Sequence, residues 1–186
     1  MHPHIELAQR ARDLAMSGDI GPSHLLGYEM PRANRYYPFL YHLAGMLKPR
    51  RTVELGVRLG TSLAHLVSGV QPGCEVMGVD HTKDTGGSLE YLVTIGNSID
   101  TAATHGPGRP IDLLFIDATK SIDEWVAWRP FCADDVVVCL DDRRTEGKGL
   151  WASIGGTDKL ELDELHGVLG GQVHGFGVFV GRDDAP

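Results

Sequence analysis

The sequence has no run of apolar residues long enough to cross a membrane. Such a span needs about 20 consecutive apolar residues, and no segment of the 186-residue chain approaches that length. Charged side chains also interrupt residues 1 to 18, where a signal peptide would need an apolar stretch. The sequence therefore predicts a cytoplasmic protein with no membrane partner.

Positive charge and cysteine are also scarce. Lys and Arg number 17 against 25 Asp and Glu, which gives a formal net charge of -8 at pH 7. Because a polyanion is bound by a basic surface that displaces counterions, we expect a small-molecule partner and no nucleic acid. The three cysteines, Cys74, Cys132 and Cys139, lack metal-ligand spacing, and an odd number is typical of a reducing compartment.

The chain does contain enough apolar residues, 42% of the sequence, for a folded core. Its length predicts one domain over residues 1 to 186. Apolar side chains recur at helical spacing over residues 5 to 16 and 33 to 47. We therefore expect an N-terminal helical cap of residues 1 to 48, followed by a core of residues 49 to 182.

From residue 52 onward, short apolar runs alternate with helical segments. Runs that are apolar on successive residues suit strands covered on both faces, and alternation with helices indicates a parallel, doubly wound α/β sheet. The segment KLELDEL and a last run at 175 to 181 are expected to pair antiparallel at one edge. Further strands are predicted at residues 52 to 56, 74 to 80, 91 to 96, 111 to 117 and 135 to 142. Further helices are predicted at residues 60 to 70, 98 to 105 and 121 to 130.

A glycine-containing turn joins the first predicted strand to a helix in the segment TVELGVRLGTS, residues 52 to 62. Gly56 lets the backbone approach a ligand closely, and Gly60 removes a Cβ at the helix start. About twenty residues later the next strand ends at Asp80, where a carboxylate can accept hydrogen bonds from the hydroxyl groups of a ribose. Glu54 and Asp80 therefore indicate a ribosyl ligand. The alternative is an ordinary tight turn, with Asp80 capping the next segment.

Three more aspartates end neighbouring strands: Asp117 after IDLLFI, and Asp141 and Asp142 after VVVCL. Ligands of an open parallel sheet bind at the carboxyl ends of its strands, so these side chains should meet. A hard divalent cation such as Mg2+ would offset their repulsion and could stabilise the alkoxide of a hydroxyl acceptor. Lys120 would then have a lowered pKa and act as base. Alternatively, the aspartates cap helices or face solvent, and Lys120 lies on the surface.

The glycine turn resembles a known family. A dinucleotide-binding turn has the pattern Gly-x-Gly-x-x-Gly beneath a pyrophosphate, whereas this chain has Glu54, Gly56 and Gly60. The pattern is similar to motif I of class I S-adenosylmethionine (SAM)-dependent methyltransferases, where the acidic residue serves the amino-acid end of the cofactor. The resemblance implies a Rossmann-like methyltransferase fold, with a mainly parallel seven-stranded sheet, two N-terminal helices and an antiparallel C-terminal edge strand.

The same resemblance implies a set of cofactor contacts. Gly96, Asn97 and Ser98 stand where the family holds the adenine, although Ser98 is also placed to cap its helix. His81 and His166 could contact cofactor or acceptor, or lie on the surface, and we assign them no catalytic role. The implied SAM-binding residues are Glu54, Gly56, Gly60, Thr61, Ser62, Asp80, His81, Asn97, Ser98 and Asp117.

The segment FIDATK, residues 115 to 120, resembles the Phe-Ile-Asp-Ala-Asp-Lys signature of cation-dependent O-methyltransferases, the group of the caffeoyl-CoA and catechol enzymes. There the counterpart of Asp117 binds metal and the lysine, here Lys120, is the proposed base. The next strand in that group ends in Asp-Asn. Here it ends in Asp141 and Asp142, as in the Mg2+-dependent sugar O-methyltransferases of macrolide biosynthesis. The resemblance implies methylation of a phenol, catechol or sugar hydroxyl, with Asp117, Asp141 and Asp142 as metal ligands.

Several features leave the interpretation open. The crossover at residues 81 to 90 is too short for the helix usual in the family, while Met30 lies where the catechol enzyme has a methionine near the cofactor. One alternative is a metal-independent methyltransferase that acts on nitrogen or on a macromolecule. Another is a SAM-binding module without turnover. No motif reports oligomeric state, so a homodimer stays open.

Overall fold

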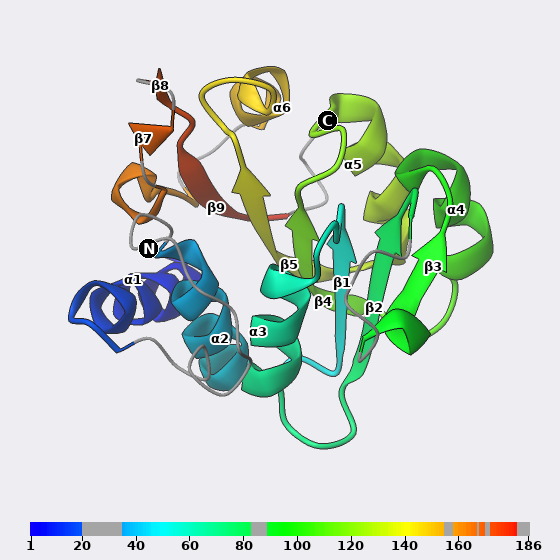
Figure 1. Cartoon of the computed structure of the whole chain (residues 1–186), viewed down its shortest axis with the longest axis horizontal. Coiled ribbons are helices and arrows are strands. Elements are labelled where there is room, and N and C mark those ends of the chain that lie inside the picture. The colour runs from blue at the N-terminus through cyan, green and yellow to red at the C-terminus, as the bar shows by residue number, and fades with distance from the viewer. Residues whose placement is uncertain (20–34, 83–88, 155–157, 167, 170–171, 182–186) are drawn as a thin grey trace.

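Seven strands form one mixed sheet at the centre of the molecule (Figure 1). The structure, a computed structural model, describes residues 1–19, 35–82, 89–154, 158–166, 168–169 and 172–181. The strand order is β3-β2-β1-β4-β5-β9-β6. Strands β1 to β5 run parallel to one another, whereas β9 lies antiparallel between β5 and β6. The strands are β1 (Arg51–Leu55), β2 (Glu75–Asp80), β3 (Val93–Ile95), β4 (Ile111–Ile116), β5 (Cys132–Asp141), β6 (Lys159–Glu161) and β9 (Phe176–Val180).

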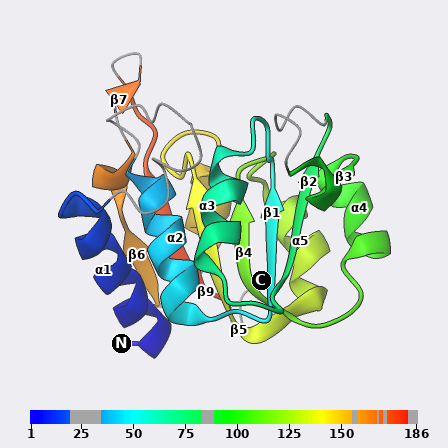
Figure 2. The same ribbon diagram turned by 60° about the horizontal axis from the view of Figure 1, so that its bottom comes forward.

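Helices cover both faces of this sheet (Figures 1 and 2). Residues of the first three helices pack in one buried cluster with one face of the sheet, and residues of the last three pack in a second cluster on the opposite face. The first group is α1 (Pro3–Met16), α2 (Tyr36–Leu47) and α3 (Thr61–Gly69). The second group is α4 (Ser98–His105), α5 (Ile122–Trp128) and α6 (Lys148–Ser153).

Strand β4 shows why the central strands are apolar on successive residues. Leu113 and Phe115 pack with the cluster beneath α1 and α2, whereas Leu114 and Ile116 pack with the cluster beneath α4 and α5. All four side chains are fully buried. Because neighbouring side chains of a strand point to opposite faces, a strand covered on both sides needs an unbroken apolar run.

Short elements complete the chain. Among the described residues, the 3-10 turns η2 (Glu90–Leu92), η3 (Arg129–Phe131) and η4 (Asp163–Leu165) precede β3, β5 and β7. A separate two-stranded ribbon pairs β7 (Val168–Leu169) with β8 (Gln172–Val173). The ribbon lies at the end of the molecule toward which the parallel strands point (Figures 1 and 2). No helix in the described part of the chain is long and apolar enough to span a membrane.

This architecture confirms the predicted fold class. The predicted pairing of the last two strands is present, with β6 at the edge and β9 inside the sheet. Strand β5 begins at Cys132 and not at residue 135, because a register shift against β4 accommodates the exposed Asp134 and Asp135. The expectations for Met30 and for most of the short crossover, residues 83 to 88, fall outside the described residues.

Helices α2 and α3 approach each other closely at glycine. A Cβ added at Gly69 would lie 2.4 Å from the carbonyl oxygen of Tyr41 and 3.1 Å from the Cβ of Ala44. Real side chains do not tolerate the first of these distances, so the helices would have to separate. The glycine therefore sets how closely α3 packs on the N-terminal helices.

We expect Gly69→Ala to lower the free energy of unfolding by about 1 to 3 kcal/mol, because the added methyl group overpacks this contact. Chemical denaturation measures the change. Gly149→Ala in α6 is the matched control, since a Cβ there meets nothing within 4 Å. It should raise the free energy of unfolding by at most about 1 kcal/mol through helix propensity. Equal losses in the two variants would contradict the close contact.

Candidate active site

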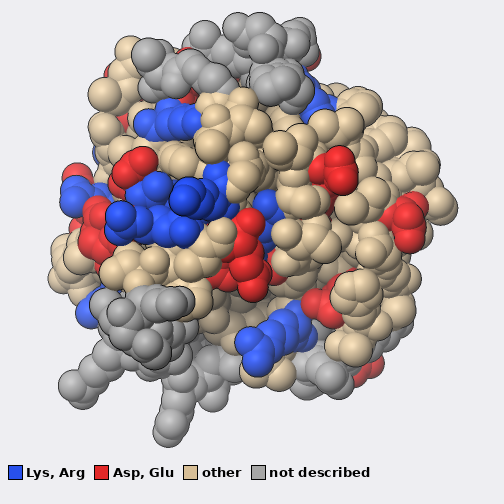
Figure 3. All heavy atoms as spheres, turned by 90° about the horizontal axis from the view of Figure 1, so that it is seen from above, with Lys and Arg blue, Asp and Glu red and all other residues tan. Residues whose placement is uncertain are grey.

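The carboxyl ends of the parallel strands border a cavity of about 620 Å³. Its volume lies within the range of roughly 300 to 1,000 Å³ that is usual for small-molecule sites. Figure 3 views the molecule from this end, where acidic and basic side chains lie next to one another near the centre of the face. Loops after β1, β2, β4 and β5 contribute to the cavity wall, as expected for an open parallel sheet.

The turn after β1 requires glycine at Gly56. Its φ of 91° is in the left-handed region, and an added Cβ would lie 2.5 Å from the carbonyl oxygen of Asp117. The loops after β1 and β4 can therefore approach only because Gly56 has no side chain. Gly60, with a φ of 82°, begins α3 without a side-chain cap.

Glu54 lies beneath this turn and is fully buried. Its Oε1 accepts a hydrogen bond from the Ser62 hydroxyl, while its Oε2 is buried with no hydrogen-bond partner among the described residues. Burial raises the pKa of Glu54 well above its usual value, although the hydrogen bond from Ser62 opposes this, and the charge of Asp117 raises it further. Ser62 lines the cavity and Glu54 does not, so the carboxyl group supports the wall from behind.

The ends of β2 and β3 carry the other predicted cofactor residues. The half-buried Asp80 lines the cavity and accepts hydrogen bonds from the backbone N–H groups of Arg58 (2.7 Å) and Thr82 (3.0 Å). Ser98 also lines the cavity, and its hydroxyl group donates a hydrogen bond to Glu124. The helix cap expected of Ser98 comes instead from Asn97, whose Oδ1 accepts from the first N–H groups of α4.

The cavity thus brings together most of the predicted SAM contacts, whose roles remain predictions. Those that line it are Gly56, Thr61, Ser62, Asp80, His81, Ser98 and Asp117. Those that lie outside the lining are Glu54, Gly60 and Asn97.

Lys120 lies among carboxylates. Its Nζ is 3.0 Å from Asp117 Oδ1, 2.8 Å from Asp142 Oδ2 and 3.1 Å from Glu146 Oε2, and its side chain is 6% exposed. Burial alone would lower the pKa of Lys120, but the charge of Asp117 and the hydrogen bond to Asp142 outweigh it and raise this pKa. In this arrangement the carboxylates favour the ammonium form of Lys120, and the lowered pKa expected beside a bound cation stays a prediction.

The pKa values of Asp117 and Asp142 are shifted by burial and by these neighbouring charges. Burial and the neighbouring charge of Asp141 raise the pKa of Asp117 well above its usual value, although Lys120 opposes the shift. Burial alone would also raise the pKa of Asp142, but hydrogen bonds from Lys120 and His174 lower it. Lys120 and Asp142 both have φ values in the left-handed region, 54° and 51°. Such backbone strain clusters at functional sites.

Glu124 is a supporting residue that sequence reasoning missed. It is fully buried in the first turn of α5, and its carboxylate accepts from the Ser98 hydroxyl and from the backbone N–H of Lys120 at 2.8 Å. One side chain therefore fixes the loops after β3 and β4 together. An acidic residue in a first helical turn is common, so its position in the sequence carried no signal.

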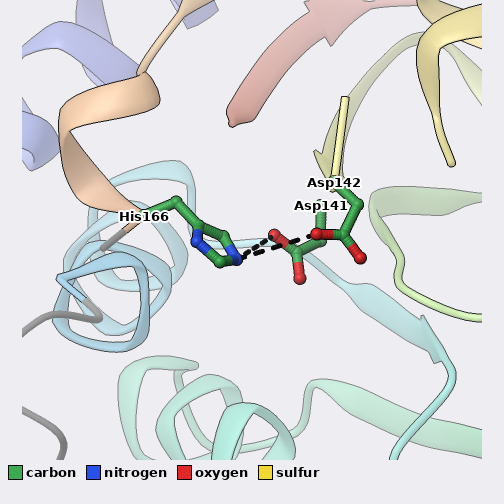
Figure 4. A group of neighbouring side chains, drawn as sticks. All are labelled: Asp141, Asp142 and His166. Carbon is green, nitrogen blue, oxygen red and sulfur yellow. Dashed lines mark ion pairs between the residues drawn. The ribbon is translucent and has the colours of Figure 1, made fainter. Parts of the chain in front are cut away.

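The donor atoms that could hold a metal differ in part from the predicted set. Asp141, Asp142 and His166 each offer a ligand atom, and these atoms lie within 4.8 Å of one another (Figure 4). The predicted ligand Asp117 is absent from this group and pairs with Lys120 instead. His166 had no recognisable spacing from the strand-end aspartates, because a long stretch of chain separates them.

Comparisons with known proteins agree with this fold. Residues 53–143 match a family model described as a methyltransferase domain. Catechol O-methyltransferase of Mycobacterium tuberculosis is 29% identical over 126 residues, which cover 61% of this chain. The chain spans 57% of the length of that relative.

Solved structures show the same architecture. An O-methyltransferase of Bacillus cereus in complex with SAH has a TM-score of 0.65 at 16% identity, covering 95% of this chain and 91% of the other. TomG of Streptomyces achromogenes, an O-methyltransferase involved in tomaymycin synthesis and solved with SAM, has a TM-score of 0.64 at 16% identity, covering 98% and 91%. The predicted Rossmann-like methyltransferase fold is thus confirmed, and residues 53–143 resemble a methyltransferase domain.

The buried Glu54 predicts a pH-dependent stability. Its pKa is raised in the folded chain, so its contribution is present below the unfolded pKa of about 4.3 and is lost as pH rises through the folded pKa. Glu54→Gln stays neutral and should therefore gain stability relative to the wild-type chain as pH rises. Chemical denaturation of both proteins from about pH 4 to about pH 9 measures the difference.

The matched control is Glu90→Gln, because Glu90 is exposed. Its stability relative to the wild-type chain should not follow this trend. A difference between Glu54→Gln and the wild-type chain that stays constant across the pH range would contradict the assignment of a buried carboxyl with a raised pKa.

Proposed function

We propose that this protein is a SAM-dependent O-methyltransferase that uses a divalent cation and methylates a hydroxyl group of a small molecule. The observation that carries the proposal is the meeting, in one cavity, of the turn at Gly56, the ribose-binding candidate Asp80 and the aspartates that follow β4 and β5. The match to a methyltransferase domain covers all of them. Related folds solved with SAH and SAM support the cofactor.

The cavity residues suit an adenosyl cofactor. Gly56 lines the cavity, and its missing side chain lets the loop after β4 close against this turn. Asp80 offers a half-buried carboxylate for the ribose hydroxyl groups, and Ser98 lines the wall near the end of β3. Ser62, fixed by Glu54, supplies a hydroxyl on the side of α3. The turn has no Gly-x-Gly-x-x-Gly pattern for a pyrophosphate, which favours SAM over a dinucleotide.

The part of the cavity at Asp141 and Asp142 suits a cation. Asp141 is only 5% exposed, and its Oδ1 has no hydrogen-bond partner among the described residues. Carboxylate oxygens are ligands of hard divalent ions, so Asp141 and Asp142 would hold such an ion. When bound, the ion lowers the pKa of an acceptor hydroxyl group and stabilises its alkoxide.

Lys120 is the candidate base, with one further requirement. As an ammonium group it must first give up a proton before it can accept one from the acceptor hydroxyl. Asp117 Oδ1 lies 3.0 Å from Lys120 Nζ, and the pKa of Asp117 is raised. A divalent cation held beside Asp142 would oppose the charges that raise the pKa of Lys120, and would so favour the neutral amine that a base requires. The chain's other contribution is alignment, since in-line methyl transfer depends on position more than on covalent catalysis.

One observation favours a second candidate, a metal-independent methyltransferase. The Lys120 ammonium group already bridges Asp117 and Asp142 and offsets part of their charge. The carboxylates would then be structural, and the acceptor nitrogen or oxygen would be deprotonated by another group. In both cases the net charge of -8 argues for a small acceptor over nucleic acid. We also propose a cytoplasmic location.

The cofactor assignment predicts the effect of Asp80→Asn. We expect this variant to bind SAH about 10- to 100-fold more weakly, because a hydrogen bond to a charged group contributes about 1.5 to 3 kcal/mol. Titration calorimetry measures the affinity, and the wild-type chain should bind SAH but not NAD. Asp123→Asn, an exposed substitution in α5, is the control and should keep wild-type affinity. Unchanged SAH binding by Asp80→Asn would contradict the role of Asp80.

The cation assignment predicts the effect of Asp141→Asn. We expect this variant to lose cation-stimulated methyl transfer to phenol, catechol and sugar acceptors while it keeps SAH binding, because Asp141 is not among the residues assigned to the cofactor. Methyl transfer from labelled SAM, with and without EDTA, measures the effect. Wild-type activity that survives EDTA, together with full activity of Asp141→Asn, would replace this proposal with the metal-independent one.

A further inference from the structure

Two histidines reach the proposed cation site from the base of the β7–β8 ribbon. His166 directly follows η4 and stands shortly before β7, and His174 directly follows β8. The ribbon lies at the same end of the molecule as the carboxyl end of β5 (Figures 1 and 2), and the backbone N–H of Arg144 donates to the carbonyl oxygen of His174. Both histidines line the cavity, yet both lie beyond the segment that matches the methyltransferase domain, residues 53–143. They are therefore an addition to the part of the site shared with that domain.

His166 points its ring nitrogen at both strand-end carboxylates (Figure 4). Its Nε2 lies 3.2 Å from Asp141 Oδ1 and 3.9 Å from Asp142 Oδ1, and its side chain is 4% exposed. Apart from this ion pair, Asp141 Oδ1 has no hydrogen-bond partner among the described residues. One imidazole nitrogen and two carboxylate oxygens thus converge in a buried position, which is the composition of a protein metal site.

The ring of His166 is fixed before any ligand arrives. It stacks on Tyr36 with a centroid distance of 5.5 Å and an interplanar angle of 18°, and on His174 at 5.4 Å and 15°. His174 Nδ1 in turn lies 2.8 Å from Asp142 Oδ1. Contacts of this kind hold metal ligands in the correct orientation. Asp117, by contrast, is engaged by Lys120.

We propose that His166 is the third protein ligand of the cation, together with Asp141 and Asp142, and that the site prefers a first-row transition-metal ion such as Mn2+ to Mg2+. The inference rests on the cation of the proposed function. Mg2+ binds oxygen ligands and keeps most of its water, whereas imidazole suits transition metals. A buried nitrogen ligand therefore strengthens Mn2+ binding more than Mg2+ binding.

Pulsed electron paramagnetic resonance of Mn2+ added to the full chain tests the ligand directly. We expect nitrogen-14 modulation from a coordinated imidazole in the wild-type protein and its loss in His166→Gln. His105→Gln, in the last turn of α4 and outside the cavity lining, is the matched control and should keep the modulation. Unchanged SAH binding by His166→Gln shows that this variant is folded.

Competition calorimetry with Mn2+ and Mg2+ tests the preference. The wild-type chain should bind Mn2+ more tightly, and His166→Gln should lose Mn2+ affinity on the order of 10- to 100-fold while its Mg2+ affinity changes less. Equal affinities for the two ions in the wild-type protein overturn the preference.

Two further outcomes separate this inference from the proposed function. Bound Mn2+ without nitrogen modulation, or modulation that persists in His166→Gln, overturns His166 as ligand and leaves the cation in place. Failure of the wild-type chain to bind Mn2+ or Mg2+ while it binds SAH overturns the inference together with the cation, and leaves the cofactor assignment standing.

Discussion

Repulsion among carboxylates at one end of the sheet is the constraint on which this site depends. Parallel strands end at the same edge, so Asp117 after β4 and the aspartates that end β5 are forced together. Like charges that are partly buried destabilise a fold unless cations offset them. Lys120 supplies one such charge through its contacts with Asp117 and Asp142. We propose that a second cation is held at Asp141 and Asp142.

The scaffold is arranged to hold these groups in place. Gly56 allows the loop after β1 to touch the loop after β4, and Glu124 binds the loops after β3 and β4 with one buried carboxylate. Glu54 supports α3 from beneath through Ser62. Because buried partners fix these loops, this part of the cavity wall is preorganised, and little free energy is spent on ordering it when a ligand binds.

The site has two structural origins. The cofactor side and the strand-end aspartates come from residues 53–143, the segment shared with the methyltransferase domain. The aromatic wall comes from elsewhere: Tyr36 from the start of α2, and His166 and His174 from the ribbon base. In the proposed function, the shared segment holds the cofactor and the cation, whereas the two flanking regions would influence the choice of metal and acceptor.

The sequence by itself determined the fold class and the strand-end aspartates, because apolar periodicity reports which faces are covered and strand ends follow from it. It also located Gly56 and Asp80 in the cavity. Only the tertiary structure decided that Glu54 is buried, that Lys120 is an ammonium group among carboxylates, and that His166 joins Asp141. These features depend on side-chain direction and on contacts between distant segments, and neither leaves a periodic signal in the chain.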